Sequence, residues 1–234
     1  METKIKQQHF EYKDDRLNKF WTIIILICSI FVFLFTVLGL TDWLSDLTSS
    51  FLLNNLGYTS KWTKSYGPEW FVNFNSQVTS LGSFSLIFIF TTVALVYYYL
   101  SRESRRFWRL LFIIIVGGVL LLINKIIFSP QIPEPFEIIT NQISTFPSGH
   151  AMMGTIFYLT FAVTIAHRQY SRKIKRLIVI TGIIITLLIG ISRILPGTHT
   201  VTEVLAGWSL GLIWLCLCWI LEKKIKLNLN ERTV

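Results

Sequence analysis

The sequence predicts an all-α, polytopic membrane protein with six transmembrane helices. Of its 234 residues, 52% are hydrophobic and only 15% are charged, a balance typical of membrane proteins rather than soluble domains. The apolar residues form continuous runs, and inside a bilayer only helices or closed barrels satisfy the backbone. Six runs approach the roughly 20 helical residues that a bilayer requires. They cover residues 20–40, 82–100, 110–125, 148–167, 177–192 and 200–221.

The net charge of +9 comes from basic residues that cluster beside alternate spans. Eighteen of the 22 Lys and Arg lie in residues 1–19, 101–109, 168–176 and 222–234. With six spans these segments share one side of the membrane, as cytoplasmic segments do. We therefore expect an integral protein of the cell (inner) membrane, with residues 1–19 and 222–234 as cytoplasmic tails and residues 20–221 as its membrane domain. The distribution favours contact with the lipid bilayer and argues against nucleic acid.

The first outer loop, residues 41–81, is long and rich in Trp, Phe and Leu. This composition favours helical segments lying in the membrane interface. Asn55, Gly57 and Gly67-Pro68 mark turns between them. Two interpretations stay open: a lid or access groove for a lipid, or an aromatic belt that anchors the loop.

The remaining connections are shorter. The inner loops, residues 101–109 and 168–176, are basic and read as plain connections. The outer loop 126–147 contains four prolines and cannot be helical throughout. The last outer connection, residues 193–199, is tight and carries Pro196-Gly197.

Two basic residues stand against the positive-inside pattern. Lys125 and Arg193 lie at the outer ends of the third and fifth predicted spans. Either one alone is best explained by a side chain that extends to the interface. Together with His150 and His199, which begin the fourth and sixth spans on the same face, they indicate a functional site.

The chemistry of these residues suits a phosphate group. Pro147 fits the first turn of a helix, which leaves the N–H groups of Ser148 and Gly149 free to point at an anion. Gly149 also permits close approach of a ligand to the backbone. Lys125 and Arg193 can neutralise phosphate oxygens.

His199 and Glu203 are four residues apart and therefore share one helix face. A carboxylate there can hold one imidazole nitrogen and leave the other as a nucleophile. His150 can then protonate a leaving oxygen. The same pair could instead be a structural hydrogen bond or half of a metal site, but two further ligands are not evident, so we expect no metal and no cofactor.

These segments resemble the type 2 phosphatidic acid phosphatase superfamily of membrane-bound lipid phosphatases over roughly residues 82–221. The family pattern is Lys-x6-Arg-Pro, Pro-Ser-Gly-His and Ser-Arg-x5-His-x3-Asp. The second motif matches in full at residues 147–150, and the third matches at Ser192, Arg193 and His199. Two positions depart from the pattern: Ile132 stands in place of Arg, and Glu203 in place of Asp.

The resemblance implies a six-helix fold, metal independence and a phosphohistidine at His199. It implies that His150 is the general acid and that the phosphate ligands are Lys125, Ser148, Gly149 and Arg193. The expected function is hydrolysis of a phosphomonoester or diphosphate on a membrane lipid at the extracytoplasmic face. Candidate substrates are polyprenyl diphosphate, phosphatidylglycerophosphate, phosphatidate and phosphorylated lipid A.

Two alternatives stay open. A phosphotransferase of the same fold would open the phosphoenzyme with an acceptor other than water. A degenerate, non-catalytic lipid-binding protein would keep the fold without the reaction, and Ile132 is the main support for it. A transporter is disfavoured, because the spans carry little in mid-membrane beyond Ser, Thr and Gly.

Overall fold

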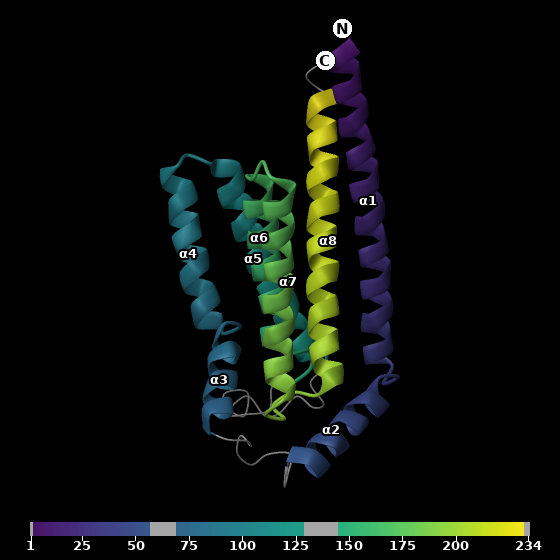
Figure 1. The fold of residues 1–234 in the computed structure, drawn as a ribbon, viewed down its shortest axis with the longest axis vertical. Coiled ribbons are helices and arrows are strands. Elements are labelled where there is room, and N and C mark those ends of the chain that lie inside the picture. The colour runs from purple at the N-terminus through teal and green to yellow at the C-terminus, as the bar shows by residue number, and fades with distance from the viewer. Residues whose placement is uncertain (1, 57–68, 129–144, 232–234) are drawn as a thin grey trace.

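A computed structural model describes residues 2–56, 69–128 and 145–231 of the chain. Within these ranges the chain forms eight helices and no strand (Figure 1). In order they are α1 (Glu2–Val37), α2 (Asp42–Leu56), α3 (Glu69–Ser80), α4 (Phe84–Leu100), α5 (Ser104–Ile127), α6 (Gly149–His167), α7 (Arg172–Ile194) and α8 (Val201–Glu231). Five of them are long and apolar enough to cross a membrane, and α3 with α4 forms a sixth candidate span, bent by 43°. The predicted all-α, six-span membrane fold is confirmed.

Several helices extend beyond the apolar runs. Helix α5 begins at Ser104 and α7 at Arg172, inside segments expected to be plain connections. Helix α1 begins at Glu2, and α8 continues to Glu231, through the expected tails. Hydropathy marks only the part of a helix that lies in hydrocarbon, whereas the intrahelical hydrogen bonds continue into the polar interface.

The first outer loop contains the expected helices, α2 and α3. Helix α2 lies obliquely across the end of the bundle below α1 and α8 (Figure 1). Helix α3 leads into α4 through a short turn, after which the Ser83 hydroxyl accepts a hydrogen bond from Leu86 N and caps α4. Asn55, where a turn was expected, lies inside α2, and the expected turns at Gly57 and Gly67-Pro68 lie outside the described residues.

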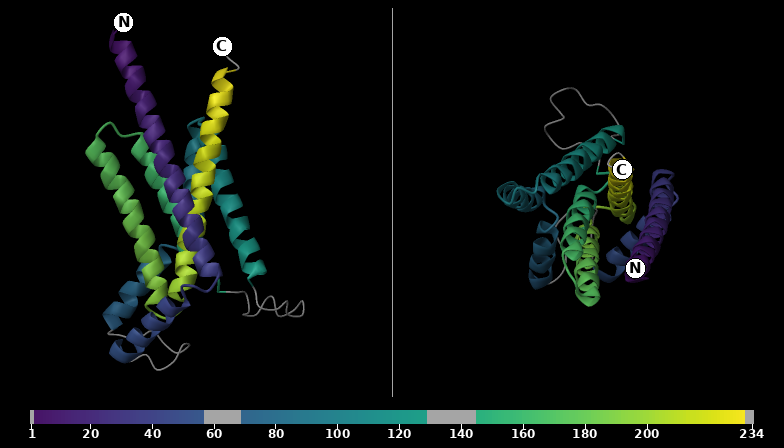
Figure 2. Two further views of the ribbon diagram at one scale, coloured as in Figure 1. Left: turned by 90° about the vertical axis from the view of Figure 1, so that its right-hand side faces the viewer. Right: turned by 90° about the horizontal axis from the view of Figure 1, so that it is seen from above.

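Helix α6 occupies the middle of the bundle, with α5, α7 and α8 packed against it (Figure 2). Of the residues in the apolar stretch of α6, 61% are buried inside the protein, whereas only 11% are buried in the apolar stretch of α1. Around α6 lies the core cluster, which consists of Ile87, Ile113, Leu121, Met152, Met153, Ile156, Phe157, Trp214, Leu215 and Cys218. The helix that carries His150 is therefore the most firmly enclosed part of the fold.

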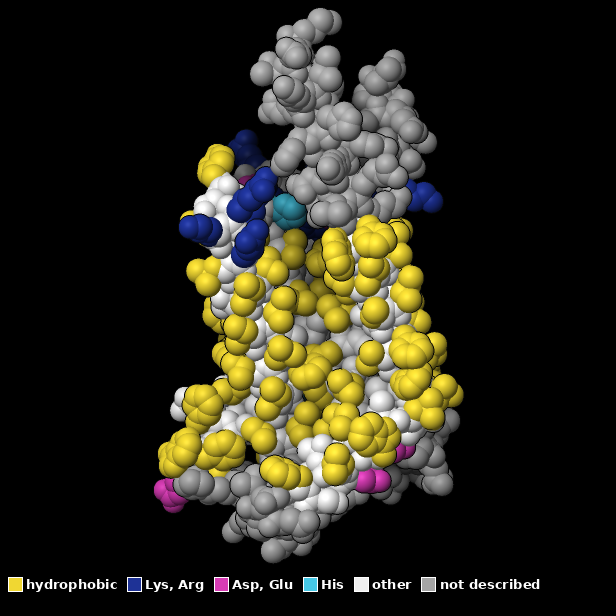
Figure 3. Space-filling view, turned by 45° about the vertical axis from the view of Figure 1, so that its right-hand side comes forward, with side chains coloured by type: hydrophobic (Ala, Val, Ile, Leu, Met, Phe, Trp, Pro, Cys, Tyr) yellow, Lys and Arg dark blue, Asp and Glu magenta, His cyan; other side chains and the backbone are white. Residues whose placement is uncertain are grey.

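The two ends of the bundle differ in charge. On the face shown in Figure 3, hydrophobic side chains cover the middle of the bundle, and Lys and Arg gather at the end that carries both termini. At that end Arg168 pairs with Glu103 at 2.8 Å, and Arg109 pairs with Glu222 at 3.3 Å. The residues singled out from the sequence lie at the opposite end.

Candidate active site

Four helix ends bring the predicted site residues together. Lys125 lies in the last turn of α5, His150 in the first turn of α6, and Arg193 in the last turn of α7. Glu203 lies in the first turn of α8, whereas His199 lies in the turn before that helix, so the two residues do not share a helix face as the sequence predicted. Electrostatic interactions link His150 to Lys125, Arg193 and His199, and link Lys125 to Glu203. The expected convergence on one end of the bundle is therefore present in the structure.

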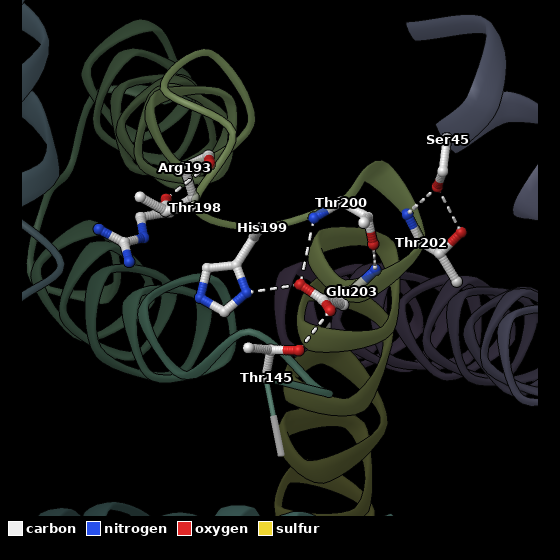
Figure 4. Close-up of polar contacts among 8 residues, drawn as sticks. All are labelled: Ser45, Thr145, Arg193, Thr198, His199, Thr200, Thr202 and Glu203. Atoms are coloured by element: carbon white, nitrogen blue, oxygen red, sulfur yellow. Dashed lines mark hydrogen bonds and ion pairs between the residues drawn. The ribbon is translucent and has the colours of Figure 1, made fainter. Parts of the chain in front are cut away.

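The centre of the site is a hydrogen bond between His199 and Glu203. Nδ1 of the imidazole lies 2.7 Å from Oε2 of the carboxylate, and both side chains are largely buried, at 10% and 15% exposed. A carboxylate accepts, so Nδ1 carries a proton and donates it to Glu203. The other ring nitrogen, Nε2, points toward the side of the site that holds Arg193 (Figure 4). In its neutral form the ring would present the Nε2 lone pair to the basic side of the site.

Glu203 also closes the first turn of α8. Its Oε2 accepts from Thr200 N at 3.1 Å, while the Thr200 hydroxyl accepts from Glu203 N at 3.2 Å. This reciprocal pair is a capping box, which requires Glu or Gln three residues after the cap. Glu203 thus has a structural role in addition to the role that the family pattern implies for this position. Because it caps α8 and also accepts from His199, it keeps His199 next to the start of the helix.

The start of α6 differs in one respect from the sequence prediction. Helix α6 begins at Gly149, with Ser148 as the extended N-cap residue, so Pro147 precedes the helix instead of occupying its first turn. Ser148 N donates to Glu203 O at 3.0 Å and is therefore not free for an anion. The first intrahelical bond is the one that Met152 N donates to Ser148 O, which leaves the N–H groups of Gly149 and His150 in the uncapped first turn.

Two buried polar atoms at the site are unsatisfied. Ser148 Oγ and Arg193 Nε have no hydrogen-bond partner among the described residues, and Ser148 is fully buried. A buried polar atom without a partner costs about 1–3 kcal/mol. Both atoms belong to residues expected to hold phosphate, and an oxyanion between them would supply the missing acceptors.

Helix α3 holds the end of α7 in place. Asn75 Nδ2 donates to Ser192 O at 3.1 Å, and the Thr79 hydroxyl donates to Ser192 Oγ at 2.9 Å. Ser192 directly precedes Arg193, so α3 fixes the backbone from which the guanidinium extends. The sequence analysis did not single out Asn75 or Thr79. Their spacing of four residues puts them on one face of α3, but Asn73, Ser76 and Gln77 lie on the same helix, so the sequence does not mark these two.

The turn between α7 and α8 positions the His199 backbone. Gly197 has a φ of +69°, which favours glycine, and its N–H donates to Ile194 O. The carbonyl of Arg193 accepts from both His199 N, at 3.1 Å, and Thr198 Oγ1, at 2.8 Å. The predicted tight turn at Pro196-Gly197 therefore places His199 directly beside Arg193.

Helix α2 makes the equivalent contact with α8. The Ser45 hydroxyl lies 2.7 Å from Thr202 Oγ1 and accepts from Thr202 N at 3.2 Å (Figure 4). Thr41 Oγ1 donates to the same threonine at 3.1 Å. Thr202 precedes Glu203, so both helices of the first outer loop are bonded to residues adjacent to the site.

His150 is only partly enclosed. Its ring contacts Phe84 edge-on, with the ring centroids 6.3 Å apart. A side chain at Gly82 would approach two carbons of His150 to 3.3 Å and Ile189 to 2.6 Å, so the turn before α4 must lack one. His150 therefore lies against the junction of α3 and α4 and stays partly open.

Lys125 is half-buried near Glu203, while Ile132, the departure in the first motif, lies outside the described residues. Across the described ranges, no group of three or more His, Cys, Asp or Glu side chains is arranged to hold a metal ion. What the site offers is two cations, unsatisfied donors at a helix start and two histidines. Such a set can bind a tetrahedral anion and supply both a nucleophile and an acid.

The sequence profile of the PAP2 superfamily matches residues 108–226, just over half of the chain. The chain belongs to the PAP2 superfamily. The matched region contains α6, α7 and nearly all of α5, together with the part of α8 that lies in the membrane. The resemblance seen in the three motifs is thereby confirmed.

Individual relatives agree with this assignment. The chain is 35% identical over 109 residues to phosphatidylglycerophosphatase B of Bacillus subtilis, a match that covers 45% of this chain and 54% of that protein. It is 36% identical over 91 residues to a PA-phosphatase related-family protein of Dictyostelium discoideum, which covers 36% of this chain and 27% of the relative. These matches thus span about half and about a quarter of the relatives' lengths.

A solved structure shares the fold over a larger region. It is a transmembrane PAP2 type phosphatidylglycerolphosphate phosphatase from Bacillus subtilis, with a TM-score of 0.61 and 23% identity. The match covers 87% of this chain and 96% of that one. The integral membrane fold of this PAP2 protein, including helices outside the family profile, therefore has a solved counterpart.

Proposed function

We propose that this PAP2 protein is a lipid phosphatase that acts through a phosphohistidine at His199. The observation that carries the proposal is the hydrogen bond from His199 Nδ1 to Glu203, which leaves Nε2 as the free nucleophile on the side of Arg193. A structural hydrogen bond alone would not require two cations and a second histidine at the same place. The family assignment supports the same chemistry.

The reaction follows from the two imidazoles. His199 Nε2 attacks phosphorus and forms the N–P bond, while the P–O bond to the lipid breaks with its electron pair on oxygen. His150, in its protonated form, donates a proton to that oxygen. Water then attacks the phosphohistidine and gives a proton to His150, which releases inorganic phosphate and restores both residues.

The phosphate is held from three sides. Arg193 and Lys125 supply positive charge, and Ser148 Oγ and the N–H of Gly149 supply hydrogen bonds. The Gly149 N–H begins the first turn of α6, where the helix dipole also favours an anion. No metal enters these steps, so chelators should leave the rate unchanged.

Phosphatidylglycerophosphate is the substrate we expect to react fastest. The B. subtilis relative that matches over 109 residues carries that activity in its name. Phosphatidate, polyprenyl diphosphate and phosphorylated lipid A complete the panel on which phosphate release by purified protein should be measured. Release by the wild type and its loss in His199→Ala would support the proposal.

Other results would lead to the alternatives. Transfer of phosphate to an added alcohol in place of water would identify a phosphotransferase. A folded wild type that releases no phosphate from any lipid of the panel would overturn the proposal and favour a non-catalytic lipid-binding protein.

We place the site on the extracytoplasmic face of the cell membrane, with both termini inside. The basis is the clustering of basic residues at the opposite end of the bundle (Figure 3). Cysteines introduced at Ser104 and Ser171 should be inaccessible to an impermeant thiol reagent added outside intact cells. Labelling of either position from outside would reverse the orientation.

A further inference from the structure

We propose that Thr145 is a positioning residue that orients Glu203 and, through it, His199. The proposal rests on the proposed function and adds a third member to the His199–Glu203 pair. The Thr145 hydroxyl donates to Glu203 Oε1 at 2.5 Å, while Oε2 of the same carboxylate faces His199 and Thr200 N (Figure 4). Each carboxylate oxygen thus has its own partners, which fixes the rotation of the carboxylate plane.

Glu203 links two motifs that are far apart in sequence. Thr145 lies just before α6, and Ser148 in the same segment donates its N–H to Glu203 O at 3.0 Å. The segment ahead of α6 is therefore bonded to one residue of α8 through both its backbone and its side chain. Gly207 permits this approach, because a Cβ there would lie 2.6 Å from Ser148 O.

The carboxylate has room to move if Thr145 releases it. A cavity of about 280 Å³ borders Glu203, and its other lining residues include Thr36, Asp42, Phe128 and Phe146. A space of this size with polar groups in its wall can hold water, which would compete for the carboxylate oxygens. The Thr145 hydroxyl opposes such a turn toward the cavity.

Side-chain length increases the need for this hydroxyl. The family pattern has Asp at this position, whereas Glu203 has one more rotatable bond and therefore more conformational freedom to lose. The capping box with Thr200 fixes one oxygen of the carboxylate. Thr145 fixes the other, so the longer side chain still presents a single geometry to His199.

The kinetic test compares Thr145→Val with Thr145→Ser on phosphatidylglycerophosphate or the most reactive lipid of the panel. Valine keeps the shape and removes the donor, and we expect kcat to fall about tenfold with KM nearly unchanged, the loss typical of one hydrogen bond to a charged group. Serine restores the donor and should recover most of kcat. Thr92→Val is the matched control, because Thr92 is exposed on α4 and its hydroxyl donates within the same helix, to Phe88 O.

A second measurement separates this proposal from the proposed function. Spectra of protein with 15N-labelled histidine report the His199 tautomer without turnover, and His199→Ala assigns the signal among the four histidines. We expect the Nδ1–H tautomer in the wild type and a shift toward Nε2–H in Thr145→Val. An active wild type whose Thr145→Val variant keeps full kcat would overturn the role of Thr145 alone. Unchanged His199 signals in Thr145→Val would overturn it whether or not the wild type is active.

Discussion

The charged side chains at the two ends of the bundle differ in the partners that they contact. At the end that carries the termini, Arg168 and Arg109 each pair with a glutamate, Glu103 and Glu222 respectively. At the other end, Lys125, Arg193 and His199 lie close enough to His150 to act on it electrostatically, and the two oxygens of Glu203 accept from His199, Thr145 and Thr200. Arg193 Nε is buried there without a partner among the described residues. Both of these arginines at the first end have a carboxylate partner, whereas Arg193 at the site keeps a buried donor that an anionic ligand would satisfy.

The difference extends to how the side chains are supported. The ion pairs of the first end join long, partly exposed side chains, which contribute little individually. At the other end, short hydroxyl and amide groups of α2 and α3 bond to Thr202 and Ser192, the neighbours of Glu203 and Arg193. Rigid support next to reactive groups is what catalysis by positioning requires.

The largest expected effect comes from the histidines. His199→Ala should abolish phosphate release, because it removes the nucleophile. His150→Ala should reduce kcat by about 10²–10⁴-fold, the usual contribution of a positioned acid. Both variants should keep the wild-type thermal transition in detergent. A folded His199→Ala protein with unchanged release would contradict the proposed mechanism.

A matched pair of arginines tests the comparison between the two ends. Arg193→Lys should lower kcat/KM by about 10- to 100-fold, since a charge-assisted contact to phosphate is worth about 1.5–3 kcal/mol. Arg109→Lys, at the end that carries the termini, should change kcat/KM less than about twofold, because partly exposed ion pairs contribute little. Equal losses in both variants would show that the two ends do not differ in the way described.

Restoring the family residue at position 132 of the first motif should increase activity. If Ile132 is a lost phosphate contact, Ile132→Arg should raise kcat/KM on a phosphomonoester lipid by about tenfold, mainly through transition-state binding. A fall on the best substrate would instead indicate a pocket shaped for a less charged head group. An unchanged rate on every lipid would show that position 132 does not face the phosphate.

The smallest effect concerns the support from α3. Thr79→Val removes the hydrogen bond to Ser192 and should lower kcat about two- to fivefold, within the range of one neutral hydrogen bond. Thr48→Val is the control, because the Thr48 hydroxyl donates to Leu44 O within α2 itself. If the two variants behave alike, the contact between α3 and α7 does not tune the site.

The fold could be predicted from the sequence because spans and charged loops carry strong local signals. The gathering of Lys125, His150 and Arg193 followed from topology alone, since each stands at the same side of its span. The ends of the helices were harder to predict from the sequence. Helices α5 and α7 begin in basic segments, which a hydropathy pattern does not count as part of a membrane span. The N-cap position of Ser148 also escaped prediction, since it depends on Glu203 O, a contact 55 residues away in sequence.

The site residues that the sequence analysis did not identify were overlooked for one common reason. Thr145, Asn75 and Thr79 act through hydrogen bonds to Glu203 and Ser192, and such partners become visible only when distant segments meet. Small polar residues are common in loops and interfacial helices, so their type alone carries no signal. The Thr200–Glu203 capping box is the exception, because its spacing could be recognised in the sequence itself.

Detection of the phosphoenzyme tests the central claim most directly. Protein quenched during turnover of a 32P-labelled phosphomonoester lipid should carry label that is acid-labile and base-stable, and peptide mapping should place it on His199. His150→Ala should accumulate more of it if breakdown slows more than formation, and His199→Ala should carry none. Label that persists in His199→Ala, or active wild type that carries no label under rapid quenching, would contradict a phosphohistidine at His199.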